Sequence, residues 1–277
     1  NVEIIFGDLR DKGSYKKIAN KVDFIINLAA LIGIPYSYVA SKNYIDVNIS
    51  GVHNLLELIK NSNIERFIQT STSEVYGTAK KTKLNEEDKL VAQSPYAATK
   101  ISADQLALSF FKSFNLPVKI VRPFNVYGPR QSSRAIIPTI LSQALSKKRI
   151  ITLGNKNSIR DFTYVEDVCS AFEKIYKSKK FLGQVVNIGS DQEISIKNIV
   201  SKISKILSVN LKIKQDRKRF RPKLSEVERL RCNNKKILKY SNWKPSYNLD
   251  KGLLKLIDWM KQKENLNKIN KSNKYTI

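Results

Sequence analysis

The sequence predicts an α/β protein built on a doubly wound, parallel β-sheet. Short apolar runs indicate buried strands, and longer amphipathic stretches between them indicate helices. This alternation is typical of repeated strand–helix–strand units, which place helices on both faces of a parallel sheet. The predicted strands are 22–28 (VDFIINL), 66–70 (RFIQT) and 118–121 (VKIV), and the predicted helices between them are Tyr44–Asn61 and Pro95–Asn115.

Beyond Pro123 the pattern loosens, and we expect a second, smaller region that packs against the sheet. Residues 123–133 are rich in turn formers, and the basic run 215–223 is a loop by composition. Ser195 is expected to cap the helix that follows it. The further predicted elements are helices at Ile136–Ser146, Cys169–Lys177 and Ser195–Leu207 and a strand and turn at 185–190.

Composition excludes several classes of protein. The chain has 277 residues, 42% of them hydrophobic, which is ordinary for a globular protein. The longest apolar runs fall short of the ~20 residues that a membrane span needs, and no signal peptide opens the chain. We therefore expect a cytoplasmic protein without membrane contact. Cys169 and Cys232 have no metal-ligand or CxxC spacing and are expected to be buried free thiols.

The charge is strongly basic, with 50 Lys and Arg against 24 Asp and Glu, or +26. Such a charge can attract nucleic acid, an anionic membrane or a phosphorylated substrate. The lysines are spread along the whole chain instead of forming one stripe, so we do not expect nucleic acid as a partner. A basic nucleic-acid-binding protein remains the alternative outside the enzymes.

A single histidine, His53, lies in a predicted helix. No Ser-His-Asp triad can form without it, and a site with several histidine ligands is ruled out. A surface or packing role is favoured over a catalytic one. We predict no metal site.

Tyr96 and Lys100 are four residues apart and therefore lie on one face of the helix predicted to begin near Pro95. A lysine one turn from a tyrosine can stabilise the phenolate, which makes the phenol a base. Alone, the YxxxK pattern is as compatible with a surface tyrosine. Thr72 lies 24 residues earlier at the end of a predicted strand, where it could share a substrate hydroxyl with Tyr96.

Seven motifs follow one another along the chain. They are GDLRD (7–11), NLAA (27–30), STSEVYG (71–77), SPYAATK (94–100), RPFNVYGPRQ (122–131), RDFTYVEDV (160–168) and NIGS (187–190). With these motifs the chain resembles the extended short-chain dehydrogenase/reductases that act on nucleotide sugars, over residues 1 to about 260. The resemblance implies a Rossmann-like fold, truncated at its N-terminus, with NAD as cofactor and a nucleotide-diphosphate sugar as partner.

The resemblance also divides the chain. Residues 1–125 would be the remainder of the NAD-binding domain without its first βαβ unit. Residues 126–262 would be mainly a substrate-binding region interleaved with the sheet, and 263–277 a frayed, polar tail. By resemblance alone, a homodimer is expected, with the helix Pro95–Asn115 as one of two helices at the interface.

Thr72, Ser73 and Glu74 indicate the reaction type within the family. Epimerases usually carry a small residue at the position of Glu74, whereas 4,6-dehydratases carry Thr-Asp-Glu or Thr-Ser-Glu. UDP-glucuronate decarboxylases also carry Thr-Ser-Glu and are the nearest alternative, with nucleotide-sugar epimerases next. The stretches 30–38 and 221–230 are similar to dehydratases of legionaminic acid synthesis, which act on UDP- or GDP-N-acetylglucosamine.

The resemblance implies a role for each residue. Tyr96, supported by Lys100 and Thr72, would remove the proton from the hydroxyl at carbon 4 of the sugar while NAD takes the hydride. Glu74 would then remove the acidified proton at carbon 5. Ser73 stands where many relatives have aspartate, so a water relay or Glu74 would supply the proton for loss of hydroxide from carbon 6.

Further positions are implied as contacts of the cofactor. Asp8 and Leu9 would border the adenine, although Asp8 could instead cap a helix. The positions expected at the ribose and diphosphate are Leu28, Ala29, Ala30 and Asn48, and Tyr96 and Lys100 would contact the cofactor as well.

Three positions are implied as contacts of the substrate. Asn125 and Arg160 would meet the substrate phosphates, and Arg221 lies in a loop suited to a similar contact. Arg160 could instead pair with Asp161 or Glu166, and Arg221 could be plain loop charge.

The glycine-rich fingerprint of the family is absent, since no GxxGxxG occurs in the sequence. Because GDLRD normally follows that fingerprint and the chain starts at Asn1, we expect that the first strand, first helix and second strand of the domain are missing. Such a sheet would lose central pairing and expose apolar surface.

We therefore expect this polypeptide to bind NAD poorly or not at all, because the turn that approaches the diphosphate is not in the sequence. Calorimetric titration with NAD measures this. Micromolar binding would contradict the expectation.

Overall fold

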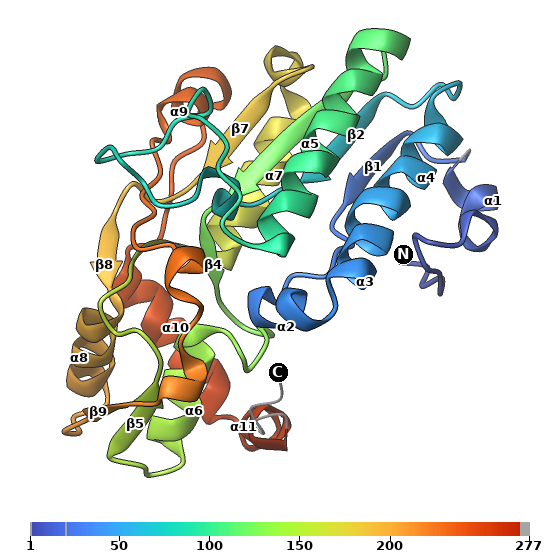
Figure 1. Ribbon diagram of the computed structural model, residues 1–277. Coiled ribbons are helices and arrows are strands. Elements are labelled where there is room, and N and C mark those ends of the chain that lie inside the picture. The colour runs from blue at the N-terminus through green and yellow to red at the C-terminus, as the bar shows by residue number, and fades with distance from the viewer. Residues whose placement is uncertain (1, 20, 272–277) are drawn as a thin grey trace.

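A computed structural model describes residues 2–19 and 21–271. Its main sheet is parallel, in the order β1-β2-β3-β7, and helices pack on both faces (Figure 1). This confirms the predicted doubly wound α/β class. The strands are β1 (Phe24–Asn27), β2 (Arg66–Thr70), β3 (Val118–Pro123) and β7 (Val185–Ile188).

The two faces of the sheet follow from the alternation of side chains along each strand. On β2, Phe67 packs with helices α4 (Gly51–Ile59) and α5 (Pro95–Phe114). The next residue, Ile68, packs on the opposite face with α7 (Val165–Lys177) and α9 (Lys235–Ser241). Strand β2 is therefore buried from both sides, as its continuous apolar run predicts.

The second region has its own apolar core. Three helices and the strands around them enclose it in the lower part of Figure 1, with Met260 and Ile140 completely buried. Two small sheets flank it, one in the order β4-β6-β8 and one pairing β5 with β9. The elements are β4 (Asn125–Tyr127), α6 (Ile136–Leu145), β5 (Ile150–Leu153), β6 (Ile159–Tyr164), β8 (Glu193–Ser195), α8 (Ile196–Ile206), β9 (Lys212–Gln215) and α10 (Leu249–Lys261).

Several sequence-based boundaries need correction. The stretch 44–61 is not one regular helix, because α3 (Ser41–Ile45) and α4 are joined by a π-helical turn, η2 (Asp46–Ser50). Residues 125–127 form strand β4 instead of a turn, and the expected loop 215–223 contains two short 3-10 helices, η5 (Arg217–Arg219) and η6 (Lys223–Ser225).

The tail also differs from the prediction. Lys263–Lys271 forms helix α11, which packs against α6 and α10, whereas 272–277 lie outside the described residues. The short elements that complete the chain are η1 (Lys12–Ser14), α1 (Lys16–Ala19), α2 (Ile34–Val39), η3 (Ser73–Tyr76) and η4 (Lys179–Phe181).

Strand β1 lies at the edge of the main sheet and pairs with β2. Phe24 on this strand is 44% exposed, and Val2, Ile4 and Phe6 in the preceding segment are exposed as well. Apolar surface is therefore exposed at this edge, as the sequence led us to expect. No helix among the described residues is long and apolar enough to cross a membrane.

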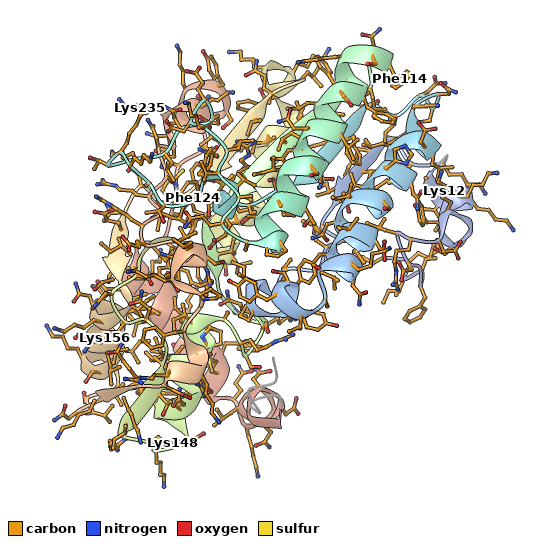
Figure 2. The ribbon with its side chains drawn as sticks, viewed as in Figure 1. Lys12, Phe114, Phe124, Lys148, Lys156 and Lys235 are labelled. Atoms are coloured by element: carbon orange, nitrogen blue, oxygen red, sulfur yellow. The ribbon has the colours of Figure 1, made fainter. Side chains whose placement is uncertain are left out.

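Basic side chains point outward from separate parts of the molecule. The labelled lysines Lys12, Lys148 and Lys235 lie at distant edges in Figure 2. Lys119 is the opposite case, because it is fully buried on β3 and its ammonium donates to the carbonyls of Ile175, Tyr176 and Ser178. It thereby satisfies the C-terminal end of α7, where carbonyl groups lack partners within the helix.

We predict that Lys119→Met lowers the free energy of unfolding by about 2–4 kcal/mol, because three buried carbonyls lose their donor while the packing volume is kept. Thermal unfolding would show a melting temperature lower by roughly 5 °C or more. Lys174→Met, on the exposed face of α7, is the control. Equal melting temperatures for the two variants would contradict the capping role of Lys119.

Candidate active site

The segment that follows β2 turns sharply, and Thr72 and Gly77 define the turn. The Thr72 hydroxyl accepts a hydrogen bond from the Glu74 amide at 3.2 Å and so caps η3. Gly77 ends η3 with φ of +64°, and a Cβ there would come within 2.8 Å of the Val91 carbonyl oxygen. Glycine is therefore required at the end of the STSEVYG motif.

Helix α5 begins where the sequence predicts. Pro95 is its first residue, and the Ser94 hydroxyl accepts from the Ala97 amide at 3.1 Å. This start places Tyr96 and Lys100 on the face of α5 that meets the end of β2. Both side chains are buried, at 6% and 3% exposure.

The side chains of Tyr96 and Thr72 are brought close together, as predicted. Burial raises the pKa of the Tyr96 phenol, while the nearby Thr72 hydroxyl opposes that rise. The Tyr96 ring also packs edge-on against Tyr44 of α3, with 6.2 Å between ring centroids. Tyr44 was not predicted from the sequence, which offers no motif that marks it.

Lys100 reaches the end of β2. Its ammonium donates to the Thr70 carbonyl oxygen at 2.6 Å. Burial lowers the pKa of Lys100 to about 8, and the charge of Asp104 opposes that shift. In this structure the lysine therefore anchors α5 to β2, one turn from the phenol that it was predicted to support.

Glu74 lies in η3 with its side chain 12% exposed, and Arg221 approaches it. The nearest atoms, Arg221 Nη1 and Glu74 Oε2, are 3.9 Å apart, and that Nη1 is buried without a hydrogen-bond partner among the described residues. Arg221 is thus not plain loop charge. Its neighbour in the motif, Ser73, is 3% exposed.

Arg160 lies in the same cluster and pairs with a residue that the sequence analysis did not single out. Its Nη2 is 3.6 Å from Glu226 Oε1, and the alternatives Asp161 and Glu166 are wrong. Burial lowers the pKa of Arg160, whereas the Glu74 and Glu226 carboxylates raise it. Glu226 lies within the stretch 221–230, which contributed to the family resemblance. The sequence therefore marked the stretch that contains Glu226, but it did not predict that Glu226 pairs with Arg160.

Asn125 is on β4, beside β6, which carries Arg160. Its Oδ1 is buried and has no hydrogen-bond partner among the described residues. A buried acceptor without a donor is costly in a protein on its own, and a ligand donor would satisfy it. Its predicted contact with substrate remains a prediction.

The positions predicted for the cofactor differ in their surroundings. Leu28 is 67% exposed at the end of β1, and the next two residues, Ala29 and Ala30, extend this open backbone. Asn48, in contrast, is 1% exposed. Its amide bonds Leu31 O at 3.0 Å, Leu31 N at 2.8 Å and Thr99 at 3.0 Å, so it fixes the loop after β1.

The GDLRD segment is anchored beside α4. Leu9 packs against Gly51, where a Cβ would come within 2.8 Å of the leucine side chain. Asp8 is exposed and bonds Arg10, whose guanidinium lowers the Asp8 pKa to about 2. Helix capping by Asp8 is therefore wrong, since Asp11 caps η1.

Other candidates lie apart from this cluster. His53 is exposed on α4 against the ring of Phe110.

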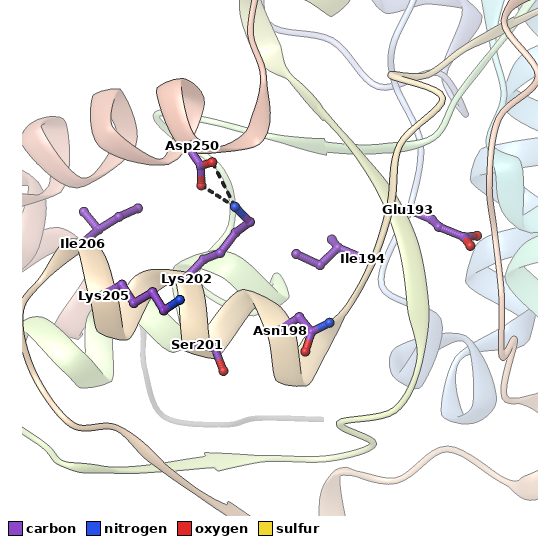
Figure 3. A pocket seen from close by; sticks show the side chains of 8 residues that line it. All are labelled: Glu193, Ile194, Asn198, Ser201, Lys202, Lys205, Ile206 and Asp250. Atoms are coloured by element: carbon purple, nitrogen blue, oxygen red, sulfur yellow. Dashed lines mark hydrogen bonds and ion pairs between the residues drawn. The ribbon is translucent and has the colours of Figure 1, made fainter.

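A surface hollow of about 640 Å³ lies between α8 and α10 (Figure 3). Its charges pair with protein groups, as with Lys202 Nζ and Asp250 at 2.7 Å, and none of its lining residues was predicted as a site. Among residues 2–19 and 21–271 no group of His, Cys, Asp or Glu is arranged to hold a metal.

The geometry can be compared with known proteins. The model of the GDP-mannose 4,6-dehydratase family matches residues 1–256. The chain belongs to this family. Protein Agl12 of low-salt glycan biosynthesis from Haloferax volcanii is 29% identical over 94% of this chain and 82% of its own length. The dTDP-D-glucose 4,6-dehydratase of Dictyostelium discoideum is 36% identical over 74% of this chain, which spans half of that protein.

Solved structures agree with this membership. The dTDP-glucose 4,6-dehydratase from Bacillus anthracis, in complex with NAD, has a TM-score of 0.83 and 29% identity, over 95% of this chain and 81% of that one. The UDP-glucuronic acid 4-epimerase from Bacillus cereus, in complex with UDP-glucuronic acid and NAD, has a TM-score of 0.83 and 30% identity, over 89% and 78%. Dehydratases and epimerases are thus similarly close, and the reaction type has to be argued from the site.

We predict that Thr72→Val loosens η3, because the variant loses the hydroxyl that caps the helix. A lost cap is worth about 1 kcal/mol, so hydrogen exchange of the amides at 74–77 should be roughly fivefold faster. Thr72→Ser keeps the hydroxyl and is the control. Exchange at the same rate in both variants would show that the cap does not hold η3.

Proposed function

We propose that this protein is an NAD-dependent nucleotide-sugar 4,6-dehydratase, and that its substrate is a UDP- or GDP-N-acetylhexosamine such as N-acetylglucosamine. The observation that carries the proposal is the position of Glu74. Glu74 and Thr72 belong to the same turn and both act on the pKa of Tyr96, so a sugar with its carbon 4 hydroxyl at Tyr96 would bring carbon 5 toward Glu74. An epimerase acting at carbon 4 needs no such second base.

NAD would lie at the ends of β1 and β2, where Leu28 is 67% exposed and the Thr70 hydroxyl is buried without a partner among the described residues, although the glycine-rich turn expected at its diphosphate is absent from the sequence. Leu28, Ala29, Ala30, Tyr96 and Lys100 would hold it, with Asp8, Leu9 and Asn48 in supporting positions. When bound, NAD would accept a hydride from carbon 4, and the reduced cofactor would later return a hydride to carbon 6.

The protein's own residues would move the protons. Tyr96 takes the proton of the carbon 4 hydroxyl, with Thr72 holding that oxygen in place. The resulting ketone acidifies carbon 5, and Glu74 removes its proton. Hydroxide leaves carbon 6 as water once it is protonated, either by Glu74 or by a water at Ser73. Arg160, Arg221 and Asn125 would bind the phosphates of the substrate.

One observation favours a second candidate, a decarboxylase of a UDP-hexuronate. That reaction requires an arginine near the sugar carboxylate, and Arg221 lies 3.9 Å from Glu74, on the side where carbon 5 is expected. Release of carbon dioxide from UDP-glucuronate, followed by mass spectrometry, tests this candidate.

The assembly and location of the protein are further proposals. We infer a homodimer through α5 and a cytoplasmic enzyme, both by analogy with the family. Nucleic-acid binding is not part of the proposal, and gel shifts at physiological salt would reveal it.

We predict that Glu74→Gln removes dehydration. The amide cannot accept the carbon 5 proton, so formation of the 4-keto-6-deoxy sugar and exchange of carbon 5 with deuterated solvent should fall by about 10² or more. Glu173→Gln, at an exposed ion pair on α7, is the control. If Glu74→Gln forms product at the original rate, Glu74 is not the base that removes the carbon 5 proton.

A further inference from the structure

A buried carboxylate that the proposed reaction does not use lies behind the site. Asp104, in the middle of α5, is 0% exposed. Its Oδ2 accepts hydrogen bonds from Ser71 Oγ at 2.8 Å and from Arg122 Nε at 3.0 Å, and Arg122 Nη2 is also 3.0 Å away. Its Oδ1 has no hydrogen-bond partner in the described part of the chain.

Asp104 completes a series of contacts between α5 and the segment after β2. Side chains at 96, 100 and 104 follow one another at four-residue intervals and share a face of the helix. Tyr96 lies close to Thr72, Lys100 donates to the Thr70 carbonyl, and Asp104 accepts from Ser71. Three turns of α5 thus hold three consecutive residues at the end of β2.

The other side of the network reaches the far end of η3. Arg122, on β3, donates to the Tyr76 hydroxyl at 3.0 Å and lies over the Tyr76 ring at 5.0 Å. The Tyr76 hydroxyl donates to Asn187 Oδ1 at 2.7 Å. Since Ser71 precedes η3 and Tyr76 is its last residue, the Asp104–Arg122 pair holds both ends of the turn that carries Glu74.

The carboxylate of Asp104 also raises the pKa of Lys100. Burial lowers the pKa of this lysine to about 8, and Asp104 is the group that opposes the shift. Burial also raises the pKa of Asp104, while Arg122 and Ser71 oppose that rise and favour the carboxylate. The other charged or titratable groups around this face of α5 are Tyr96 on the helix, Tyr44 on α3, Glu74 in η3 and Arg122 on β3.

We propose that Asp104 is a positioning residue of the reaction proposed above. It holds Ser71, and with it the strand end that carries Thr72, and its negative charge keeps Lys100 an ammonium at Thr70. The part of the proposal that concerns turnover rests on the proposed function, whereas the part that concerns Ser71 and Lys100 does not.

A purely structural role makes different predictions. A buried Asp–Arg pair often adds little net stability. Removal of one partner, however, leaves the other charge buried and unpaired and destabilises the fold. Such a loss would lower the melting temperature and leave the titration of Lys100 unchanged.

The test compares Asp104→Asn with Lys119→Met in the protein that turns over substrate. Asparagine keeps the size and one acceptor oxygen but removes the charge, while Lys119→Met removes a buried charge on β3 that contacts α7 instead of the site. The alkaline limb of kcat should move to lower pH by about one unit or more for Asp104→Asn, with roughly fivefold lower kcat at pH 8. Lys119→Met should keep the profile of the original protein.

Two measurements that do not need turnover accompany the kinetics. Competitive acetylation followed by mass spectrometry should show Lys100 titrating about one unit lower in Asp104→Asn, and hydrogen exchange should be faster at 70–76. Lys119→Met should change neither. If Asp104→Asn matches Lys119→Met in both, the proposal is overturned. If no nucleotide sugar is turned over, the proposed function fails, and these two measurements still decide the role of Asp104.

Discussion

The site depends on the contact between helix α5 and the carboxyl end of strand β2. Lys100, which is 3% exposed, donates to the Thr70 carbonyl at 2.6 Å across this contact. A buried ammonium forms a strong bond to a carbonyl, and this bond fixes the distance between helix and strand. Tyr96 and Thr72 meet because this distance is fixed, and the turn that carries Glu74 starts from the same strand end.

The surroundings of Glu74 combine two regions that are distant in the sequence. Arg160 comes from β6 and Arg221 from the segment before η6, whereas Glu74 lies in η3, which follows strand β2 of the main sheet. The segment with Arg221 is held by Tyr38 of α2, whose hydroxyl is 2.7 Å from Ser225 Oγ, and by Gln93, which donates to the Leu224 carbonyl. Substrate phosphates bound at these arginines would therefore contact residues from both regions. Such a site would lie between the main sheet and the smaller second region.

The sequence predicts the parts of the fold whose signal is local. Strand 66–70 and the start of helix 95 appear as expected, because an apolar run and a Ser-Pro cap are contained in a few residues. The π-helical turn around Asn48 and strand β4 were missed, since both depend on contacts with distant segments. The site follows the same division. The pairing of Tyr96 with Thr72 was predictable from motifs, but the pairs of Arg160 with Glu226 and of Asp104 with Arg122 were not, because no spacing along the chain relates them.

Tyr96 and Glu74 would act as proton-transfer groups on neighbouring carbons of one sugar. The purified protein can be incubated with added NAD and with UDP- or GDP-N-acetylglucosamine in deuterated water, and the product analysed by mass spectrometry and NMR. We expect a product that has lost one water and carries deuterium at carbon 5. A product with the mass of the substrate and no label at carbon 5 would rule out Glu74 as the base.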